Sequence, residues 1–202
     1  MNSGELRTVP TPDDGVRRSK EQLWDEATRP RSAAPDPDRR YTEPEQLAGR
    51  RLIEAHDYLR KELTQLRDLV AQVVAGTVEQ GFARARLHAM TLRPGNTPLH
   101  GYCQAFCRIV VVHHLREDSD IFPELAAFEP GLVPVLDRLV EEHGVIHAVV
   151  ERLDRVLATQ PLDVAGLDAA VAALTDTLLS HLSYEEQELT EPLARFWGKG
   201  ER

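Results

Sequence analysis

Four segments of the chain repeat aliphatic residues at every third or fourth position, which is the spacing of one face of an α-helix. The segments span residues 45–77, 97–118, 132–157 and 162–198, and proline or glycine marks the breaks between the later ones. Four amphipathic helices with short connections predict an all-α chain folded as an up-down-up-down four-helix bundle.

The composition agrees with a helical bundle and argues against several kinds of partner. Aromatic residues make up only 5% of the chain, so we expect an aliphatic core. The net charge of −9 repels nucleic acids and anionic lipids alike. No aliphatic run approaches the ~20 residues that a membrane span needs. The sequence therefore predicts a cytoplasmic protein with neither nucleic-acid nor membrane partners. Cys103 and Cys107 lie one turn apart and are expected to be small core residues.

Residues 1–44 differ from the rest of the chain. Six of the 13 prolines fall between Pro10 and Pro44, and few apolar residues accompany them. Such a segment buries too little apolar surface to offset its chain entropy, so we expect a disordered or weakly helical tail. One short helix around Leu23 and Trp24 could dock onto the bundle. The bundle itself is then residues 45–198.

Histidines recur on the inward faces of all four predicted helices. They are His56, His113, His143, His147 and His181. A single buried histidine is usually a hydrogen-bonded core residue, but each one left without a partner would cost about 1–3 kcal/mol. A metal centre explains all five, because coordination satisfies one ring nitrogen of each. His143 and His147 are four residues apart and so share a helix face, as chelation of one ion requires.

The second helix offers two overlapping pairs of histidine and carboxylate. His113 and Glu117 are four residues apart, and so are His114 and Asp118. The face that carries His113 is the more uniformly apolar of the two, which favours His113 with Glu117 as the inward pair.

In the last helix, His181 has two candidate carboxylate partners. An ideal helix pairs His181 with Glu185, whereas Glu186 would need a π-bulge to turn inward. A quasi-repeat favours Glu186, because the interval from Glu186 to the next proline equals the interval that follows Glu117. Glu186 is therefore the predicted ligand, with Glu185 as the alternative.

Together these motifs resemble the hemerythrin-like (HHE cation-binding) family, in its bacterial single-domain type. The motifs are His56, His113-x-x-x-Glu117, Glu142-His143-x-x-x-His147 and His181-x-x-Tyr-Glu-Glu186. The resemblance covers about residues 50–193 and implies a four-helix bundle with two iron ions joined by an oxo or hydroxo bridge. It implies His143, His147 and His181 on one iron, His56 and His113 on the other, and Glu117 and Glu186 bridging. Manganese or zinc could bind the same ligand types.

The resemblance also implies a function. The iron held by only two histidines keeps one position open for dioxygen, nitric oxide or peroxide, which indicates carriage, storage or sensing of a small molecule. The alternative is an enzyme that disproportionates peroxide or reduces nitric oxide, with Tyr102, Tyr184 or His114 as a nearby proton donor. Storage of metal alone is less favoured, because the ligand set leaves one defined position open. His88 and His100 lie outside the predicted seam, and we expect them at the surface or in a loop.

Overall fold

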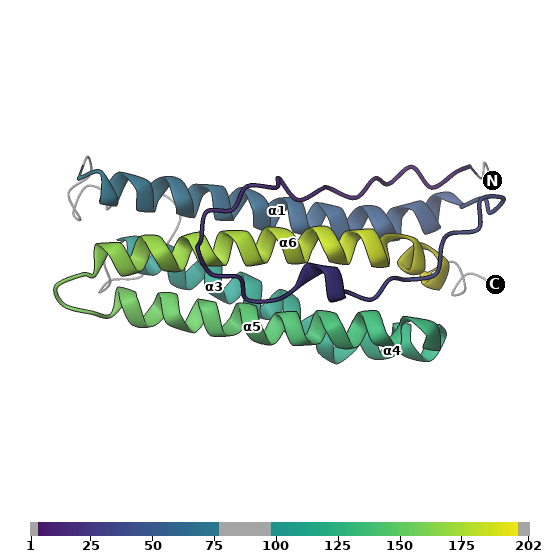
Figure 1. Cartoon of the computed structure of the whole chain (residues 1–202). Helices are drawn as coiled ribbons and strands as arrows, with labels where there is room; N and C mark the ends of the chain where they lie inside the picture. The colour runs from purple at the N-terminus through teal and green to yellow at the C-terminus, as the bar shows by residue number, and fades with distance from the viewer. Residues whose placement is uncertain (1–3, 77–97, 198–202) are drawn as a thin grey trace.

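The computed structural model describes residues 4–76 and 98–197, in which long helices lie side by side and alternate in direction (Figure 1). The four long ones are α1 (Glu43–Val74), α3 (Pro98–Arg116), α5 (Val133–Leu157) and α6 (Val164–Trp197). The predicted up-down-up-down bundle is confirmed. No helix in the described part of the chain is both long and apolar enough to cross a membrane.

The first long helix begins at a capping box. The Thr42 hydroxyl and the Glu45 carboxylate satisfy each other's backbone N–H groups at the start of α1, and Pro44 occupies the first turn. Further along, Gly49 lets α1 approach α6 closely. A Cβ atom at this position would lie 2.8 Å from Thr190 Cγ2, so only glycine fits without a shift of α6.

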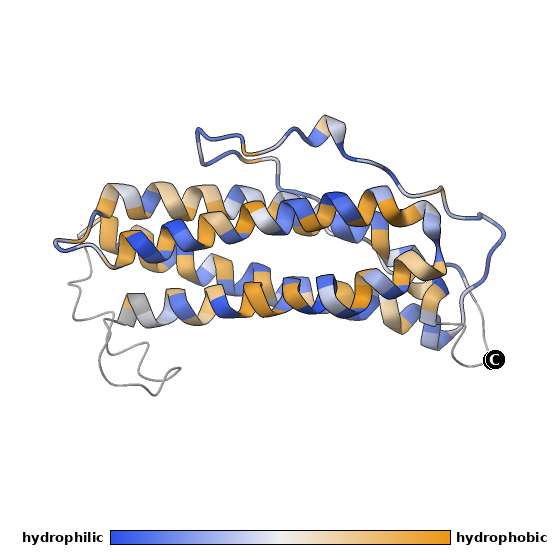
Figure 2. Cartoon of the chain, turned by 90° about the horizontal axis from the view of Figure 1, so that it is seen from below, coloured by the Kyte–Doolittle hydropathy of each residue, from blue (hydrophilic) through white to orange (hydrophobic). Residues whose placement is uncertain are grey.

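The buried residues form two hydrophobic clusters separated along the bundle by a polar layer. One cluster contains residues such as Leu63, Leu153 and Leu174, and the other contains residues such as Leu52 and Leu139. Apolar and polar residues alternate along every helix accordingly (Figure 2). The polar layer lies where the sequence analysis placed the histidines of each helix. Cys103 and Cys107 are buried free thiols in the first cluster, as predicted.

The second helix does not continue as a regular α-helix through its acidic end. After Arg116 the chain makes one π-helical turn, η2 (Glu117–Ile121), before α4 (Phe122–Phe128) and the short 3-10 turn η3 (Pro130–Leu132). In this turn the Phe122 N–H donates to the Glu117 carbonyl. Pro123 has no N–H to offer the preceding turn, which favours a wider turn here. A π-bulge in the last helix, which an inward-facing Glu186 would require, is absent, because α6 is α-helical throughout its length.

The N-terminal segment, expected to be largely disordered, follows a defined path over the bundle. We refer to residues 4–42 as the strap. It runs along α6 in one direction and returns past α6 and α5 in the other (Figure 1), with a short 3-10 turn, η1 (Glu26–Thr28), on the return. Gly4 and Tyr41 exchange two backbone hydrogen bonds, so the ends of the strap meet. Leu23 and Trp24 pack against the larger cluster.

Hydrogen bonds rather than apolar contacts hold most of the strap. Its backbone N–H groups donate to side chains of α6, for example from Asp13 to the Ser183 hydroxyl and from Ser32 to Glu188. The Tyr41 hydroxyl donates to Glu191. Composition shows that the N-terminal segment is poor in apolar groups, which predicted disorder. It does not show that a distant helix carries hydrogen-bond acceptors for the strap, and these partners explain why the strap follows a defined path.

Candidate metal centre

Histidines and carboxylates from all four long helices and the π-helical turn converge in the polar layer. They form two groups, and within each group one candidate ligand atom of every residue lies within 4.8 Å of the others. The groups are His114, His143 and His181, and His56, His113, Glu117 and Glu185. All are buried except His113, whose side chain is 17% exposed.

Two carboxylates connect the groups. The Oε1 atom of Glu117 lies 3.1 Å from His113 Nε2, and its Oε2 atom lies 3.7 Å from His143 Nε2. The Oε2 atom of Glu185 lies 3.5 Å from the Nε2 atoms of both His56 and His181. Each carboxylate thus faces one histidine of each group, which is the position that a bridging ligand takes between two metal ions.

Several side-chain atoms that face the layer have no hydrogen-bond partner although they are buried. These atoms are Nε2 of His56, His113 and His114, and Oε2 of Glu117 and Glu185. A buried polar atom without a partner costs about 1–3 kcal/mol, and native proteins contain few of them. Five such atoms converge on the polar layer, which is the arrangement expected around bound cations.

The opposite nitrogen of most of these rings is held from outside the layer. Nδ1 of His56 lies 2.9 Å from Glu186, that of His181 lies 3.1 Å from Glu142, and that of His143 lies 2.7 Å from Asp118. An ionised carboxylate only accepts hydrogen bonds, so each Nδ1 is the donor and Nε2 is the atom that faces the layer. This arrangement of carboxylate, histidine and metal is common around metal ions.

Two ring nitrogens that lie close together also support a cation site. Nε2 of His143 and Nε2 of His181 lie 3.1 Å apart. Each ring contacts a carboxylate through Nδ1, so Nε2 is the nitrogen that each ring turns toward the other and toward an ion bound between them. His114 stacks on His143 with ring centroids 4.0 Å apart, so its Nε2 joins the same group. A cation between the rings would be coordinated by these nitrogens in place of their contact with each other.

Burial sets the protonation of the histidines. It lowers the pKa of His113 to about 4 and that of His143 to about 2, and it lowers the pKa of His114 strongly. These rings are neutral near pH 7, which is the form that binds metal. His181 is the exception, because hydrogen bonds to Glu142 and Glu185 outweigh burial and raise its pKa.

The two central carboxyl groups respond in opposite ways. Burial, together with the nearby charge of Glu185, raises the pKa of Glu117. For Glu185, burial acts in the same direction, but the imidazole of His181 that faces it, with smaller contributions from the other nearby histidines, outweighs burial and lowers the pKa. One proton held between crowded carboxylates is the expected state without a metal ion.

The structure brings together most, but not all, of the residues predicted as ligands. His56, His113, Glu117, His143 and His181 belong to the two groups. His147 and Glu186 do not, and His114 and Glu185 take their places. His147 instead lies behind His114, with its Nε2 3.1 Å from His114 Nδ1. Glu186 contacts His56 from outside and pairs with Arg60 at 2.7 Å.

The tyrosines proposed as proton donors point elsewhere. The Tyr102 hydroxyl donates to Glu62, and the Tyr184 hydroxyl donates to the carbonyl of Pro30 in the strap. The side chains of His88 and His100 fall outside the described residues. From the sequence, Glu142 appeared only as part of the family motif and Asp118 only as the partner of His114. In the structure Glu142 contacts His181 and Asp118 contacts His143, and spacing along one helix gave no signal for either pair.

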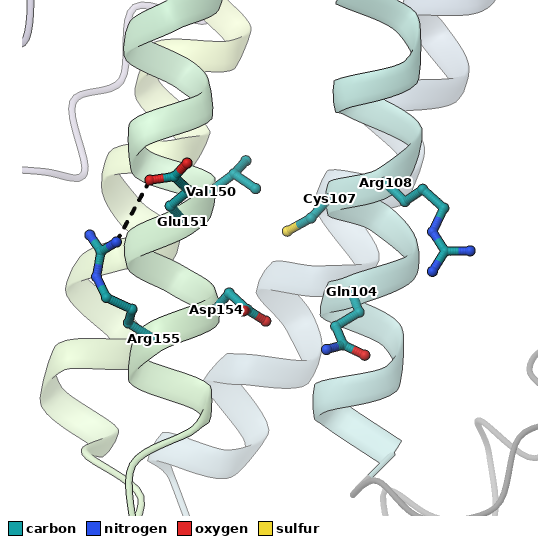
Figure 3. A pocket seen from close by; sticks show the side chains of 7 residues that line it. All are labelled: Gln104, Cys107, Arg108, Val150, Glu151, Asp154 and Arg155. Atoms are coloured by element: carbon teal, nitrogen blue, oxygen red, sulfur yellow. Dashed lines mark ion pairs between the residues drawn. The ribbon is translucent and has the colours of Figure 1, made fainter.

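A separate groove between α3 and α5 does not contain the histidines. Gln104, Cys107 and Arg108 line one wall and residues of α5, including Asp154, line the other, around about 450 Å³ (Figure 3). Burial raises the pKa of the Cys107 thiol to about 12. The thiolate that a metal ion would require is therefore disfavoured near neutral pH.

Comparison with known families agrees with this geometry. A family model described as the hemerythrin HHE cation binding domain matches residues 48–192. The chain belongs to this hemerythrin HHE family. No match was found among curated proteins or among solved structures. The HHE domain includes every residue of the two groups and leaves the whole strap outside. The predicted family is confirmed, and the HHE domain is by its description a cation-binding one.

Proposed function

We propose that this HHE domain holds two iron ions in the polar layer and binds a small molecule, such as dioxygen, nitric oxide or peroxide, at one of them. The unpaired nitrogen and oxygen atoms that converge on the layer carry the proposal. His114, His143 and His181 would hold one ion, and His56 and His113 the other. Glu117 and Glu185 would serve both.

The types of ligand favour iron over softer metals. Imidazole nitrogens suit iron, copper and zinc, whereas carboxylates suit harder ions such as manganese and iron, so iron fits both kinds. Manganese and zinc are the competitors. The only two cysteines, Cys103 and Cys107, belong to the hydrophobic cluster and not to either group.

The unequal numbers of histidines support binding of a small molecule. One group offers three imidazoles and the other offers two, so an iron ion in the second group has a free position at which it can bind a diatomic molecule or peroxide. Leu59, Ile146 and Leu178 are at most 1% exposed and lie in the adjoining cluster. Such aliphatic neighbours exclude water and restrict the site to small ligands.

Reversible binding for carriage, storage or sensing is favoured over turnover by the positions of the hydroxyl groups. Peroxide disproportionation needs a proton donor close to the reacting oxygen atoms. Tyr102 and Tyr184 use their hydroxyl protons in hydrogen bonds to Glu62 and to the Pro30 carbonyl. His114 would itself serve as a ligand in this proposal.

Metal analysis and an optical spectrum of the reconstituted protein test the proposal. We expect about two iron ions per chain, and a spectral change on addition of nitric oxide or peroxide without sustained release of oxygen. The His181→Ala variant should lose the spectrum. Sustained oxygen release would replace the proposal with the catalase-like alternative, and iron well below one ion per chain would overturn it.

A further inference from the structure

The strap makes a hydrogen bond to the carboxylate that holds one of the inward-facing histidines. The backbone N–H of Thr11 donates to Glu186 Oε2 at 2.7 Å. The other oxygen of Glu186 lies 2.9 Å from Nδ1 of His56. The Thr11 amide, 175 residues from Glu186 in the sequence, is therefore connected to the candidate ligand His56 through a single carboxylate.

A second contact of the strap reaches the other group of histidines. Arg29 donates from two nitrogens to the two oxygens of Glu142, at 2.8 and 2.9 Å. One of these oxygens lies 3.1 Å from Nδ1 of His181. The Arg29 side chain is only 7% exposed, and its guanidinium lies over the ring of Tyr184 at 4.6 Å from the centroid. Such a two-point contact fixes the plane of the Glu142 carboxylate.

We propose that the strap helps to hold the ligands of the metal centre in place. Arg29 is a positioning group for His181 through Glu142, and the Thr11 amide is one for His56 through Glu186. The inference rests on the proposed function, because it requires metal in the polar layer. Both residues lie outside residues 48–192, which match the HHE family model. These two hydrogen bonds to the centre therefore come from outside the HHE domain.

Two expectations follow from the geometry. Partners that hold a ligand from outside typically change metal affinity 10–100-fold, so loss of Arg29 should speed release of metal by a factor in this range. Coupling between two binding events is reciprocal. If the docked strap raises the affinity for metal by a given factor, bound metal must stabilise the docked strap by the same factor.

The first test compares arginine variants of the iron-loaded full chain. Arg29→Ala removes the contact, and Arg29→Lys keeps the charge without the two-point geometry. Arg40→Ala is the matched control, because Arg40 is exposed and donates only to carbonyls of Pro37 and Arg39 within the strap. Release of iron to an excess of a chelator is followed optically. We expect release about 10-fold faster for Arg29→Ala with a shifted iron spectrum, a smaller effect for Arg29→Lys, and no change for Arg40→Ala.

A second variant addresses the other contact. Thr11→Pro removes the donating N–H within a segment that already has prolines on both sides. It should speed release of one of the two ions, whereas Arg29→Ala should act on the other. Biphasic release with different fast phases in the two variants is the expected pattern.

Hydrogen exchange in the unaltered protein provides a test that depends on no variant. We expect amides of residues 11–32 to exchange about 10-fold more slowly with iron bound than without it. Equal exchange in both states, or equal iron release from Arg29→Ala and Arg40→Ala, would overturn the role of the strap while leaving the two-iron proposal intact. Failure of the unaltered protein to bind iron would overturn both, and metal analysis separates these results.

Discussion

Glu185 and Glu186 are adjacent residues with different expected roles, and exchanging each for glutamine separates them. In the structure Glu185 faces one histidine of each group at 3.5 Å, whereas the one histidine that Glu186 contacts is His56, at Nδ1 and from outside the layer. Glutamine preserves the shape of either side chain but removes its charge. Glu185→Gln should therefore impair both metal ions, and Glu186→Gln should affect only the ion near His56.

The expected losses of metal affinity differ because Glu185 would bind the metal ions directly, whereas Glu186 would only hold a ligand from outside. Structural zinc sites bind with about 10–16 kcal/mol through four ligands, so one ligand contributes about 3 kcal/mol, or about 100-fold in affinity. Loss of a shared ligand applies this factor to both ions. Glutamine at position 186 still offers His56 an oxygen acceptor, so the expected loss is about 10-fold, at the lower end of the range for an outer partner.

The assay is iron content after reconstitution and desalting, with affinities from competition against a chelator of known strength. We expect less than one ion per Glu185→Gln chain and close to two per Glu186→Gln chain. Circular dichroism of both variants controls for loss of the fold. If Glu186→Gln loses more iron than Glu185→Gln, the ligand set read from the structure is wrong and the quasi-repeat in the sequence identified the correct residue.

Three further predictions concern the site and the stability of the fold. His114→Ala should lower iron to about one ion per chain while His147→Ala retains two, because His147 only backs His114; metal analysis showing the reverse order would restore His147 as the ligand. Gly49→Ala should lower the free energy of unfolding by about 1–3 kcal/mol through the clash with Thr190 Cγ2, and the added Thr190→Ser change should recover part of it in urea unfolding. Burial opposes ionisation of Glu45, but hydrogen bonds from Thr42 outweigh it and lower the pKa. The stabilisation is therefore present above the unfolded pKa of about 4.3 and is lost as pH falls through the folded value. Glu45→Gln should cost about 1 kcal/mol at pH 7 and almost nothing at pH 2, and an equal cost at both pH values would contradict this origin.

The helices could be predicted because their apolar stripes are long and regular. The residues of the two hydrophobic clusters on α1, α5 and α6 follow the spacing of three and four found in the sequence. The histidines interrupt these stripes at one level of the bundle, which is why the position of the polar layer also followed from the sequence. The family assignment rested on the same residues and is confirmed.

Spacing along the sequence was a weaker guide to which of two neighbouring side chains faces the polar layer. His147 follows His143 by four residues, which turns it about 40° around the helix axis. This rotation leaves His147 half-buried, whereas His143 is 1% exposed. The preference for Glu186 assumed a widened turn in α6, but the widened turn follows Glu117 instead. Helical geometry alone had favoured Glu185. The ligand roles themselves stay predictions until metal is measured.

The path of the strap was not visible in the sequence because its partners are far away along the chain. Arg29 lies among prolines and charged residues, and nothing near it in the sequence indicates that Glu142 will receive it. Sequence patterns report local periodicity, whereas this contact depends on two complementary segments that only the folded bundle brings together.

The separation in sequence between the strap and its partners also determines when the strap can dock during synthesis. Thr11 is made 175 residues before Glu186, and Tyr41 is made 150 residues before Glu191. At about 5–20 residues per second, a ribosome needs roughly 10–35 s to add the residues that separate Thr11 from its partner. The strap is therefore made before the helix that it contacts and can dock only once α6 exists, so the centre acquires its outer hydrogen bonds from the strap only then.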